Sequence, residues 1–240
     1  KKTFTKISSE SSNYIEKCFN KSIEILKLNK KKCALINGPI SKKAFLKSKY
    51  LGITEYLSNK TKSNNELMLI YNKKMSVSPI TTHIPIKYVS KKINKKKIIN
   101  NVIKINDFYK NNLRRKVKFA ILGLNPHCET VDKISEEERI IIPSIKYLEK
   151  MKFDVQGPFS ADTFFLKKNL DKFDVVIGMY HDQVLTPIKT IFNFNAINIT
   201  VGLPFIRISP DHGPNAEMIG KNESDPSSFF YAMNFIDKLK

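Results

Sequence analysis

Three segments of the chain share one pattern, in which a short and nearly continuous apolar run ends in a polar segment. These runs cover residues 118–124, 173–178 and 196–201. Strands that are apolar along their whole length are typical of a parallel sheet that helices cover on both faces. Shorter apolar runs that are candidates for further strands lie at 33–36, 67–71 and 77–82. The sequence therefore predicts an α/β protein.

Helices are expected between these runs. Apolar residues recur at helical spacing within 8–30. Ser41 follows an Asn-Gly-Pro turn and is placed to cap a second helix. The strongly basic stretch 91–118 is expected to form a surface helix with loops.

The formal net charge of +20 raises the question of nucleic-acid binding, because basic surfaces attract phosphate backbones. Of the 42 basic residues, however, only four are arginine, and the lysines are spread along the whole chain. Proteins that read nucleic acids favour arginine for its bidentate guanidinium fork. We therefore expect a solvated, lysine-rich surface and no nucleic-acid partner.

The cysteines bear on the cellular compartment. Cys18, Cys33 and Cys128 form no CxxC pair, and an odd number favours free thiols in a reducing compartment. No stretch reaches the roughly 18 apolar residues of a membrane span, and no signal-peptide pattern opens the sequence. These features predict a cytoplasmic protein without a membrane partner. The sequence begins at Lys1 and not at Met, so we expect an upstream segment to be missing.

Three of the four histidines follow short apolar runs directly. His83 comes after 77–82, His127 ends the motif ILGLNPH, and His181 follows GMY. Ligands of open α/β sheets bind beyond the carboxyl ends of the strands, and three imidazoles there can hold a metal and leave positions open for substrate. For any one histidine alone, an ordinary loop or core role is the stronger interpretation. The shared context makes one divalent metal the leading hypothesis.

Two carboxylates accompany these histidines. Asp182 is adjacent to His181, and Asp162 lies in the motif GPFSADTFF. Carboxylates near metal-binding imidazoles commonly orient the ring or complete the ligand set. Both are therefore candidates for a catalytic or orienting role.

Arg207 is the most informative basic residue. Lysine supplies almost every other positive charge, so an arginine after an apolar run suggests a planar fork for a carboxylate or phosphate. Lys189 and Asn198 lie between His181 and Arg207 in the sequence and are candidates for the same anion. A solvated surface role remains open for Arg207 and is the stronger interpretation for Lys189 alone.

Read together, these segments resemble the 4-hydroxythreonine-4-phosphate dehydrogenase family of vitamin B6 biosynthesis. The resemblance covers most of the chain and is most specific in the run 174–213. The matching segments are INGPISKKAF (36–45), GITEYL (52–57), ITTHIPIK (80–87), ILGLNPH (121–127), GPFSADTFF (157–165), DVVIGMYHDQVLTPIKT (174–190) and AINITVGLPFIRISPDHG (196–213).

The resemblance implies an isocitrate- or isopropylmalate-dehydrogenase-like fold, with two α/β lobes around a cleft and an incomplete N-terminus. Residues 1–50 and 201–240 would form the first lobe, on the nucleotide side. Residues 51–200 would form the second lobe, with the metal, the substrate and the dimer interface. It further implies a homodimer and NAD-dependent oxidation and decarboxylation of 4-phosphohydroxythreonine to 3-amino-2-oxopropyl phosphate, in pyridoxal phosphate biosynthesis.

The resemblance also assigns roles to individual residues. The family's metal ligands, for one Zn, Co or Mg ion with one histidine supplied across the dimer interface, match His83, His127 and His181. The family's substrate-binding positions match Thr54, Lys189, Asn198 and Arg207. No GxGxxG fingerprint is present. The segment that instead resembles the nucleotide-binding loop of the β-decarboxylating dehydrogenases opens with Asp211, His212 and Gly213.

Three departures from the family pattern leave other functions open. The glycine-rich opening segment is absent, Ile53 replaces a histidine, and residues 128–133 replace a glycine-rich acidic loop. One alternative is a related dehydrogenase of another phosphorylated hydroxy acid, such as phosphothreonate or phosphoerythronate. A second alternative is a catalytically impaired remnant that keeps the fold and the metal site.

Overall fold

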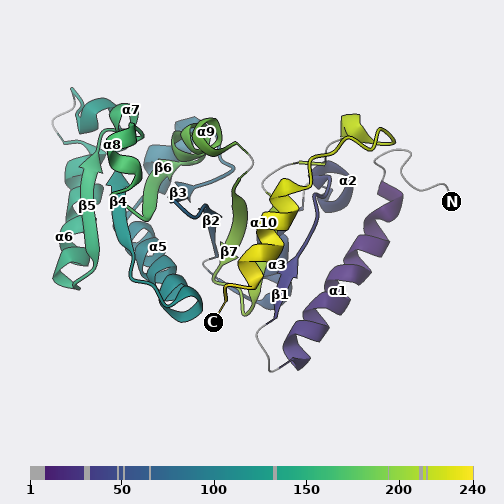
Figure 1. The fold of residues 1–240 in the computed structure, drawn as a ribbon. Coiled ribbons are helices and arrows are strands. Elements are labelled where there is room, and N and C mark those ends of the chain that lie inside the picture. The colour runs from purple at the N-terminus through teal and green to yellow at the C-terminus, as the bar shows by residue number, and fades with distance from the viewer. Residues whose placement is uncertain are drawn as a thin grey trace. The chain divides into compact units, whose positions relative to one another are not determined.

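A computed structural model describes residues 9–29, 33–47, 49–50, 52–64, 66–131, 134–193, 195–210, 213–214 and 216–239. The chain folds into two structural units (Figure 1). Residues 1–66 and 194–239 form the first unit, and residues 67–193 form the second.

The second unit is built on five strands in the order β2-β3-β6-β4-β5. The pairs β3–β6, β6–β4 and β4–β5 are parallel, whereas β2–β3 is antiparallel. The strand bounds are β2 Leu67–Tyr71, β3 Ser76–Thr81, β4 Lys118–Leu122, β5 Asp154–Phe159 and β6 Val175–Tyr180. Because β3, β6 and β4 are parallel neighbours, the segments that follow them emerge at the same edge of the sheet.

Helices pack against these strands. Helix α9 contacts β3 and β6, α5 contacts β3 and α6, and α6 runs beside β5 (Figure 1). Asn94 caps α5 by accepting a 2.9 Å hydrogen bond from the Lys97 amide. The helix bounds in this unit are α4 Val89–Lys92, α5 Lys95–Phe108, α6 Ile142–Lys150, α7 Ala161–Phe164, α8 Lys167–Leu170 and α9 His181–Phe192. π-Helical turns at Tyr109–Leu113 and Glu137–Ile141 follow α5 and precede α6.

The first unit contains three strands in the order β1-β8-β7, with β1–β8 parallel and β7–β8 antiparallel. Helix α1 contacts β1, and α10 contacts all three strands. The strand bounds are β1 Ala34–Ile36, β7 Ile197–Val201 and β8 Ile206–Pro210. The helix bounds are α1 Ser12–Leu28, α2 Lys42–Leu46, α3 Ile53–Thr61 and α10 Ser227–Ile236.

Each unit has its own apolar interior. The cluster in the first unit consists of Phe19, Ile23, Leu46, Ile53, Tyr56 and Leu57. The second unit buries side chains of its central strands and of α5 and α9, among them Val77, Ile105, Phe119, Ile177 and Ile188. Burial of this apolar surface is the main driving force for the fold of each unit.

Two strand pairs differ from the expected parallel arrangement. Four residues separate β2 from β3, and four separate β7 from β8. Connections this short permit only antiparallel pairing, because a parallel crossover needs a dozen or more residues. The continuous apolar runs were therefore correct indicators of buried strands but could not show direction.

The predicted helix within 8–30 is confirmed as α1, and the predicted cap is confirmed because Ser41 Oγ accepts from the Ala44 amide at 3.4 Å. The division into a nucleotide-side lobe and a metal and substrate lobe stays a prediction. In the compact units of the structure, residues 51–66 and 194–200 belong to the first unit. Thr54 and Asn198 therefore lie in the same unit as Arg207.

Among the described helices, none has the length and apolar character of a membrane span.

Candidate functional site

The three predicted metal ligands lie beyond the ends of neighbouring strands in the second unit. His83 follows β3 by two residues, His127 follows β4 by five, and His181 is the first residue of α9, directly after β6. The ring centroids of His83 and His181 are 5.6 Å apart. The expected position at strand ends is therefore confirmed, and the structure brings two of the three imidazoles together.

Asp182 fixes the ring of His181. Nδ1 of His181 lies 2.7 Å from Oδ1 of Asp182. A contact at Nδ1 leaves Nε2 as the nitrogen for a further partner, and carboxylate partners of metal-binding histidines act in this way. The orienting role predicted for Asp182 thus has a geometric basis.

His127 adopts a left-handed backbone conformation, with φ of 54°. Its Nδ1 lies 3.8 Å from Oδ2 of Asp162, and its side chain is largely exposed. Ser160 Oγ donates a 2.8 Å hydrogen bond to Asp162. This hydrogen bond and the nearby His127 lower the pKa of Asp162, so the carboxylate stays ionised.

Across the parts of the chain that the structure describes, no group of three or more His, Cys, Asp or Glu side chains is arranged to hold a metal. The resemblance implies a ligand set completed by a second subunit, so a single chain is expected to assemble fewer than three ligands. Imidazole donors suit Zn or Co better than Mg, which prefers oxygen. The three-histidine set stays a prediction.

Sequence reasoning missed a buried carboxylate behind the His127 segment. Glu137 is 1% exposed. Its Oε1 accepts from the backbone amides of Leu124 at 2.7 Å and Asn125 at 2.9 Å, and its Oε2 accepts from Asn125 Nδ2 at 2.9 Å. Glu137 lies within a run of three glutamates, which gave no sign that one of them is buried.

Gln183 is a second residue that the sequence did not reveal. Its Nε2 donates to the Gly123 carbonyl at 2.7 Å, and its Oε1 accepts from the Met179 amide at 2.7 Å. Gly178 faces the same helix, where an added Cβ would lie 2.4 Å from Val184 Cγ1. One side chain thus ties the end of β4, before His127, to the end of β6, before His181.

We expect Glu137→Gln to destabilise the second unit by about 1–3 kcal/mol, because an amide NH₂ replaces one carboxylate acceptor among buried donors. Burial raises the pKa of Glu137, but the hydrogen bonds from Asn125 and Leu124 outweigh it and lower the pKa overall. A lowered folded-state pKa adds stability above the unfolded value of about 4.3, and that stability is lost as the pH falls through the folded value.

Urea unfolding of the wild type and the variant at neutral and acidic pH measures this. The gap between their free energies of unfolding should shrink in acid. Glu149→Gln, at an exposed position of α6, is the matched control and should behave like the wild type. A Glu137→Gln variant as stable as this control at neutral pH would contradict the assignment.

Arg207 lies inside the first unit and is 4% exposed. Its Nε donates to Asn37 Oδ1 at 2.7 Å, and its Nη1 donates to Thr200 Oγ1 at 3.2 Å. Thr54 Oγ1 lies 3.4 Å from Thr200 Oγ1. The surface interpretation of Arg207 is therefore wrong, and two of the predicted substrate-binding residues share one polar cluster.

The buried guanidinium keeps its charge. Burial lowers the pKa of Arg207 to about 10, and the carboxylate of Glu55 acts in the opposite direction. At neutral pH the group is therefore cationic. A buried cation held by two neutral acceptors is suited to bind an anion.

The other predicted residues are placed as follows. Asn198 lies on β7 in the first unit, and Lys189 is an exposed residue of α9 in the second. Asp211 and His212 lie outside the described residues, and Gly213 is exposed.

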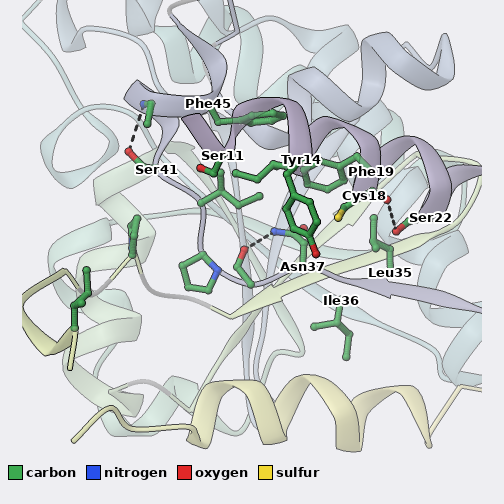
Figure 2. A pocket seen from close by; sticks show the side chains of 17 residues that line it. Ser11, Tyr14, Cys18, Phe19, Ser22, Leu35, Ile36, Asn37, Ser41 and Phe45 are labelled. Atoms are coloured by element: carbon green, nitrogen blue, oxygen red, sulfur yellow. Dashed lines mark hydrogen bonds between the residues drawn. The ribbon is translucent and has the colours of Figure 1, made fainter. Parts of the chain in front are cut away.

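A cavity of about 590 Å³ lies in the first unit, between α1, the loop after β1 and the segment around Pro214 and Ile219 (Figure 2). Its wall is largely apolar, with Tyr14, Cys18 and Leu35 among the lining side chains. The cavity borders the segment that was expected to bind a nucleotide.

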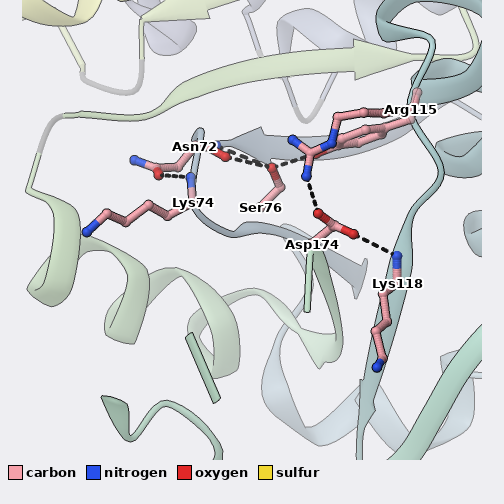
Figure 3. A network of polar contacts seen from close by, with 7 residues as sticks. Asn72, Lys74, Ser76, Arg115, Lys118 and Asp174 are labelled. Carbon is pink, nitrogen blue, oxygen red and sulfur yellow. Dashed lines mark hydrogen bonds and ion pairs between the residues drawn. The ribbon is translucent and has the colours of Figure 1, made fainter. Parts of the chain in front are cut away.

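The opposite edge of the second unit's sheet carries a different network (Figure 3). Asp174, just before β6, is ion-paired with Arg115 and accepts a 2.9 Å hydrogen bond from the Lys118 amide. Ser76 Oγ lies 2.8 Å from the hydroxyl of the buried Tyr109. The Ser76 amide also donates a 2.8 Å hydrogen bond to the Asp174 carbonyl. These contacts hold the amino ends of β3, β4 and β6 together, whereas the histidines follow the carboxyl ends.

The fold is that of an α/β dehydrogenase. An isocitrate dehydrogenase from Methylococcus capsulatus superposes with a TM-score of 0.55 at 10% identity, over 91% of this chain and 70% of that chain. A putative 4-hydroxythreonine-4-phosphate dehydrogenase from Salmonella typhimurium superposes with a TM-score of 0.83 at 28% identity, over 97% of this chain and 72% of that chain. The predicted fold class is confirmed.

The family model of the pyridoxal phosphate biosynthetic protein PdxA matches residues 1–236, and the chain belongs to this family. The 4-hydroxythreonine-4-phosphate dehydrogenase of Sulfurihydrogenibium sp. (strain YO3AOP1) is 44% identical over 217 residues, which are 89% of this chain and 67% of that protein. The enzyme of the same name from Pseudoalteromonas translucida is 35% identical, over 86% of this chain and 64% of that protein. The chain thus spans about two thirds of the length of these relatives.

Proposed function

We propose that this chain catalyses the NAD-dependent oxidation and decarboxylation of 4-phosphohydroxythreonine to 3-amino-2-oxopropyl phosphate, a step of pyridoxal phosphate biosynthesis. The observation that carries the proposal is the buried cationic Arg207, in the segment where the match to the family is most specific. Its relatives include curated dehydrogenases named for this phosphorylated substrate.

The proposed reaction has two stages. The carbon that bears the hydroxyl loses a hydride to NAD, and the hydroxyl loses its proton, which leaves a ketone β to the carboxylate. The bond to the carboxylate carbon then breaks, carbon dioxide leaves, and a proton takes its place. In this scheme Arg207, Thr54 and Asn198 bind an anionic group of the substrate, and Lys189 stays a candidate for substrate binding.

The histidines would hold one divalent ion, Zn, Co or Mg. The fit is supported by the adjacent rings of His83 and His181 and by the carboxylate that fixes His181. When bound there, a divalent cation would supply Lewis-acid polarisation of a substrate oxygen. Asp162 and Asp182 would orient His127 and His181.

The cavity in the first unit supports the nucleotide proposal. Its apolar wall with Tyr14 suits a flat aromatic ring, and it borders the segment around Pro214 and Ile219. We assign the NAD-binding role to this part of the chain, with Asp211, His212 and Gly213 as contributors.

We further propose a cytoplasmic homodimer, in which the partner subunit completes the metal ligands. Three histidines are needed for a facial ligand set, and the described chain brings two rings together. The mass of the protein in solution, measured by light scattering, should be twice that of the chain.

The test is the formation of NADH by the intact protein with 4-phosphohydroxythreonine and a divalent metal. Parallel assays with phosphothreonate and phosphoerythronate address the first alternative, to which Ile53 is relevant. Ile53 packs in the apolar cluster of the first unit, so it offers no polar contact where the family has histidine. Metal binding without NADH formation on any of the three compounds would indicate the impaired remnant instead.

A further inference from the structure

Besides the apolar cavity beside β1, the first unit contains a polar cavity of about 630 Å³ between α1, α2 and α3. Its charged lining consists of three lysines and one carboxylate, which are Lys47, Lys49, Lys60 and Glu16. Lys60 Nζ donates to Glu16 Oε1 at 2.7 Å. This hydrogen bond and the charge of Lys49 lower the pKa of Glu16, so the carboxylate is ionised at neutral pH. The lining therefore carries a net charge of +2.

A buried hydroxyl group faces this cavity. Tyr56 is 5% exposed and forms part of the cavity wall, and no described residue makes a hydrogen bond with its hydroxyl. The charges that act on this hydroxyl come from Lys60, Glu16 and Tyr50, which line the same cavity. Burial raises the pKa of Tyr56, so the hydroxyl keeps its proton at neutral pH.

The proton of the Tyr56 hydroxyl needs an acceptor. The nearby ammonium group of Lys60 cannot serve, because an ammonium group only donates. A buried donor without an acceptor loses its hydration and gains nothing in return. The orphaned hydroxyl in a cationic cavity therefore indicates that a bound molecule supplies the acceptor and that this molecule is an anion.

The cavity is separate from the cluster around Arg207. Asn59 and Lys60 follow Tyr56 by three and four residues, so the three side chains share one face of α3. Thr54 precedes Tyr56 by two residues, which is about 200° around the helix at about 100° per residue. Its hydroxyl lies 3.4 Å from that of Thr200, in the Arg207 cluster. Helix α3 thus stands between the two sites.

We propose that this cavity binds the phosphate group of a small phosphorylated molecule. The Tyr56 hydroxyl donates to a phosphate oxygen, and Lys47 and Lys49 supply positive charge, as lysines do in many phosphate sites. A phosphate group carries up to two negative charges and three strong acceptor oxygens, which match the charge of the lining and the orphaned donor. Phe45 and Tyr50 also line the cavity and offer ring surface to the organic part of the ligand. The site lies apart from the proposed reaction and does not rest on it.

The test measures binding of inorganic phosphate and of phenyl phosphate to the intact protein by calorimetric titration. Tyr56→Phe should weaken binding of inorganic phosphate about tenfold, the size of one hydrogen bond to a charged acceptor. Lys49→Gln, at an exposed position, should weaken it about two- to fivefold. Two exposed controls should change neither constant: Lys27→Gln near the end of α1 and Tyr231→Phe on α10.

Tighter binding of phenyl phosphate would identify an organic phosphate as the occupant, and equal affinity would identify free phosphate; both support the site. Unchanged affinity in Tyr56→Phe would overturn the proposal. An equal loss in Lys27→Gln and Lys49→Gln would overturn it too, because phosphate would then respond only to the overall surface charge. A loss in Arg207→Lys with none in Tyr56→Phe would place the phosphate in the Arg207 cluster instead.

Thermal unfolding separates a binding role of Tyr56 from a structural one. In chloride buffer, Tyr56→Phe should be at least as stable as the wild type, because it removes a buried hydroxyl without a partner. In phosphate buffer, the Tm of the wild type should rise more than that of the variant, because a ligand stabilises the folded state that binds it. The same difference in Tm in both buffers would overturn the proposal.

Discussion

His181→Ala is expected to remove most of the divalent metal from the protein, from about one ion per chain to near zero. The imidazole is one of two rings that the structure places 5.6 Å apart, and a ligand set reduced to two histidines binds weakly. Metal analysis after dialysis measures the stoichiometry. Because the Asp174 network holds the opposite edge of the sheet, the variant should remain folded.

Two further variants add a partial loss of metal affinity and a control to this experiment. Asp182→Asn keeps the imidazole but weakens the contact that fixes its ring, and should lower the metal affinity by about 10- to 100-fold. Thr186→Ala, at an exposed position of the same helix, should keep the full stoichiometry. Undiminished metal in His181→Ala would refute the ligand assignment.

The same variant tests whether two subunits share a metal site. His83 and His181 lie together in one chain, so the ligand from the partner subunit would be His127, and His181→Ala and His127→Ala should each lack metal alone. If the partner subunit supplies one ligand, subunit exchange between them should restore one intact site per mixed dimer. Absence of any recovery after exchange would indicate that each chain binds its metal independently.

Arg207→Lys is expected to lower kcat/KM for 4-phosphohydroxythreonine by about 10- to 150-fold. Lysine keeps the positive charge but cannot reproduce the planar fork that contacts Asn37 and Thr200. Loss of one charged hydrogen bond costs about 1.5–3 kcal/mol, and about 1.4 kcal/mol corresponds to a factor of ten in rate. Steady-state kinetics of the intact enzyme measures the effect.

The metal content should not change in Arg207→Lys, because Arg207 and the histidines lie in different structural units. Arg115→Lys is a suitable comparison, since Arg115 pairs with Asp174 at the sheet edge away from the histidines. An Arg207→Lys enzyme within about twofold of the wild type would show that only the charge matters at this position.

The apolar runs at 118–124, 173–178 and 196–201 correctly indicated β4, β6 and β7. They could do so because a strand buried on both faces has no polar alternation to obscure it. The direction of β3 and β8 depended instead on connections of four residues. Such connections become visible only once the strand limits are known.

The site residues that the sequence revealed belong to residue types that are rare in this chain, and one residue that it missed belongs to a common type. Histidine occurs four times in the sequence and arginine four times, so a histidine at a strand end or an arginine after one stands out. Glu137 belongs to a common residue type. Its significance comes from burial and from hydrogen bonds to a segment about twelve residues away, which no local pattern records.

The side chain of Gln183 has a further consequence for the proposed metal site. By donating to Gly123 and accepting from Met179, it holds the ends of two strands in one rigid frame before any ion arrives. An ion that enters such a frame restricts a few side-chain rotamers and no backbone, so little conformational entropy is lost. In zinc fingers, by contrast, binding and folding are the same event. Here a chelator would empty the site and leave the strands where they are.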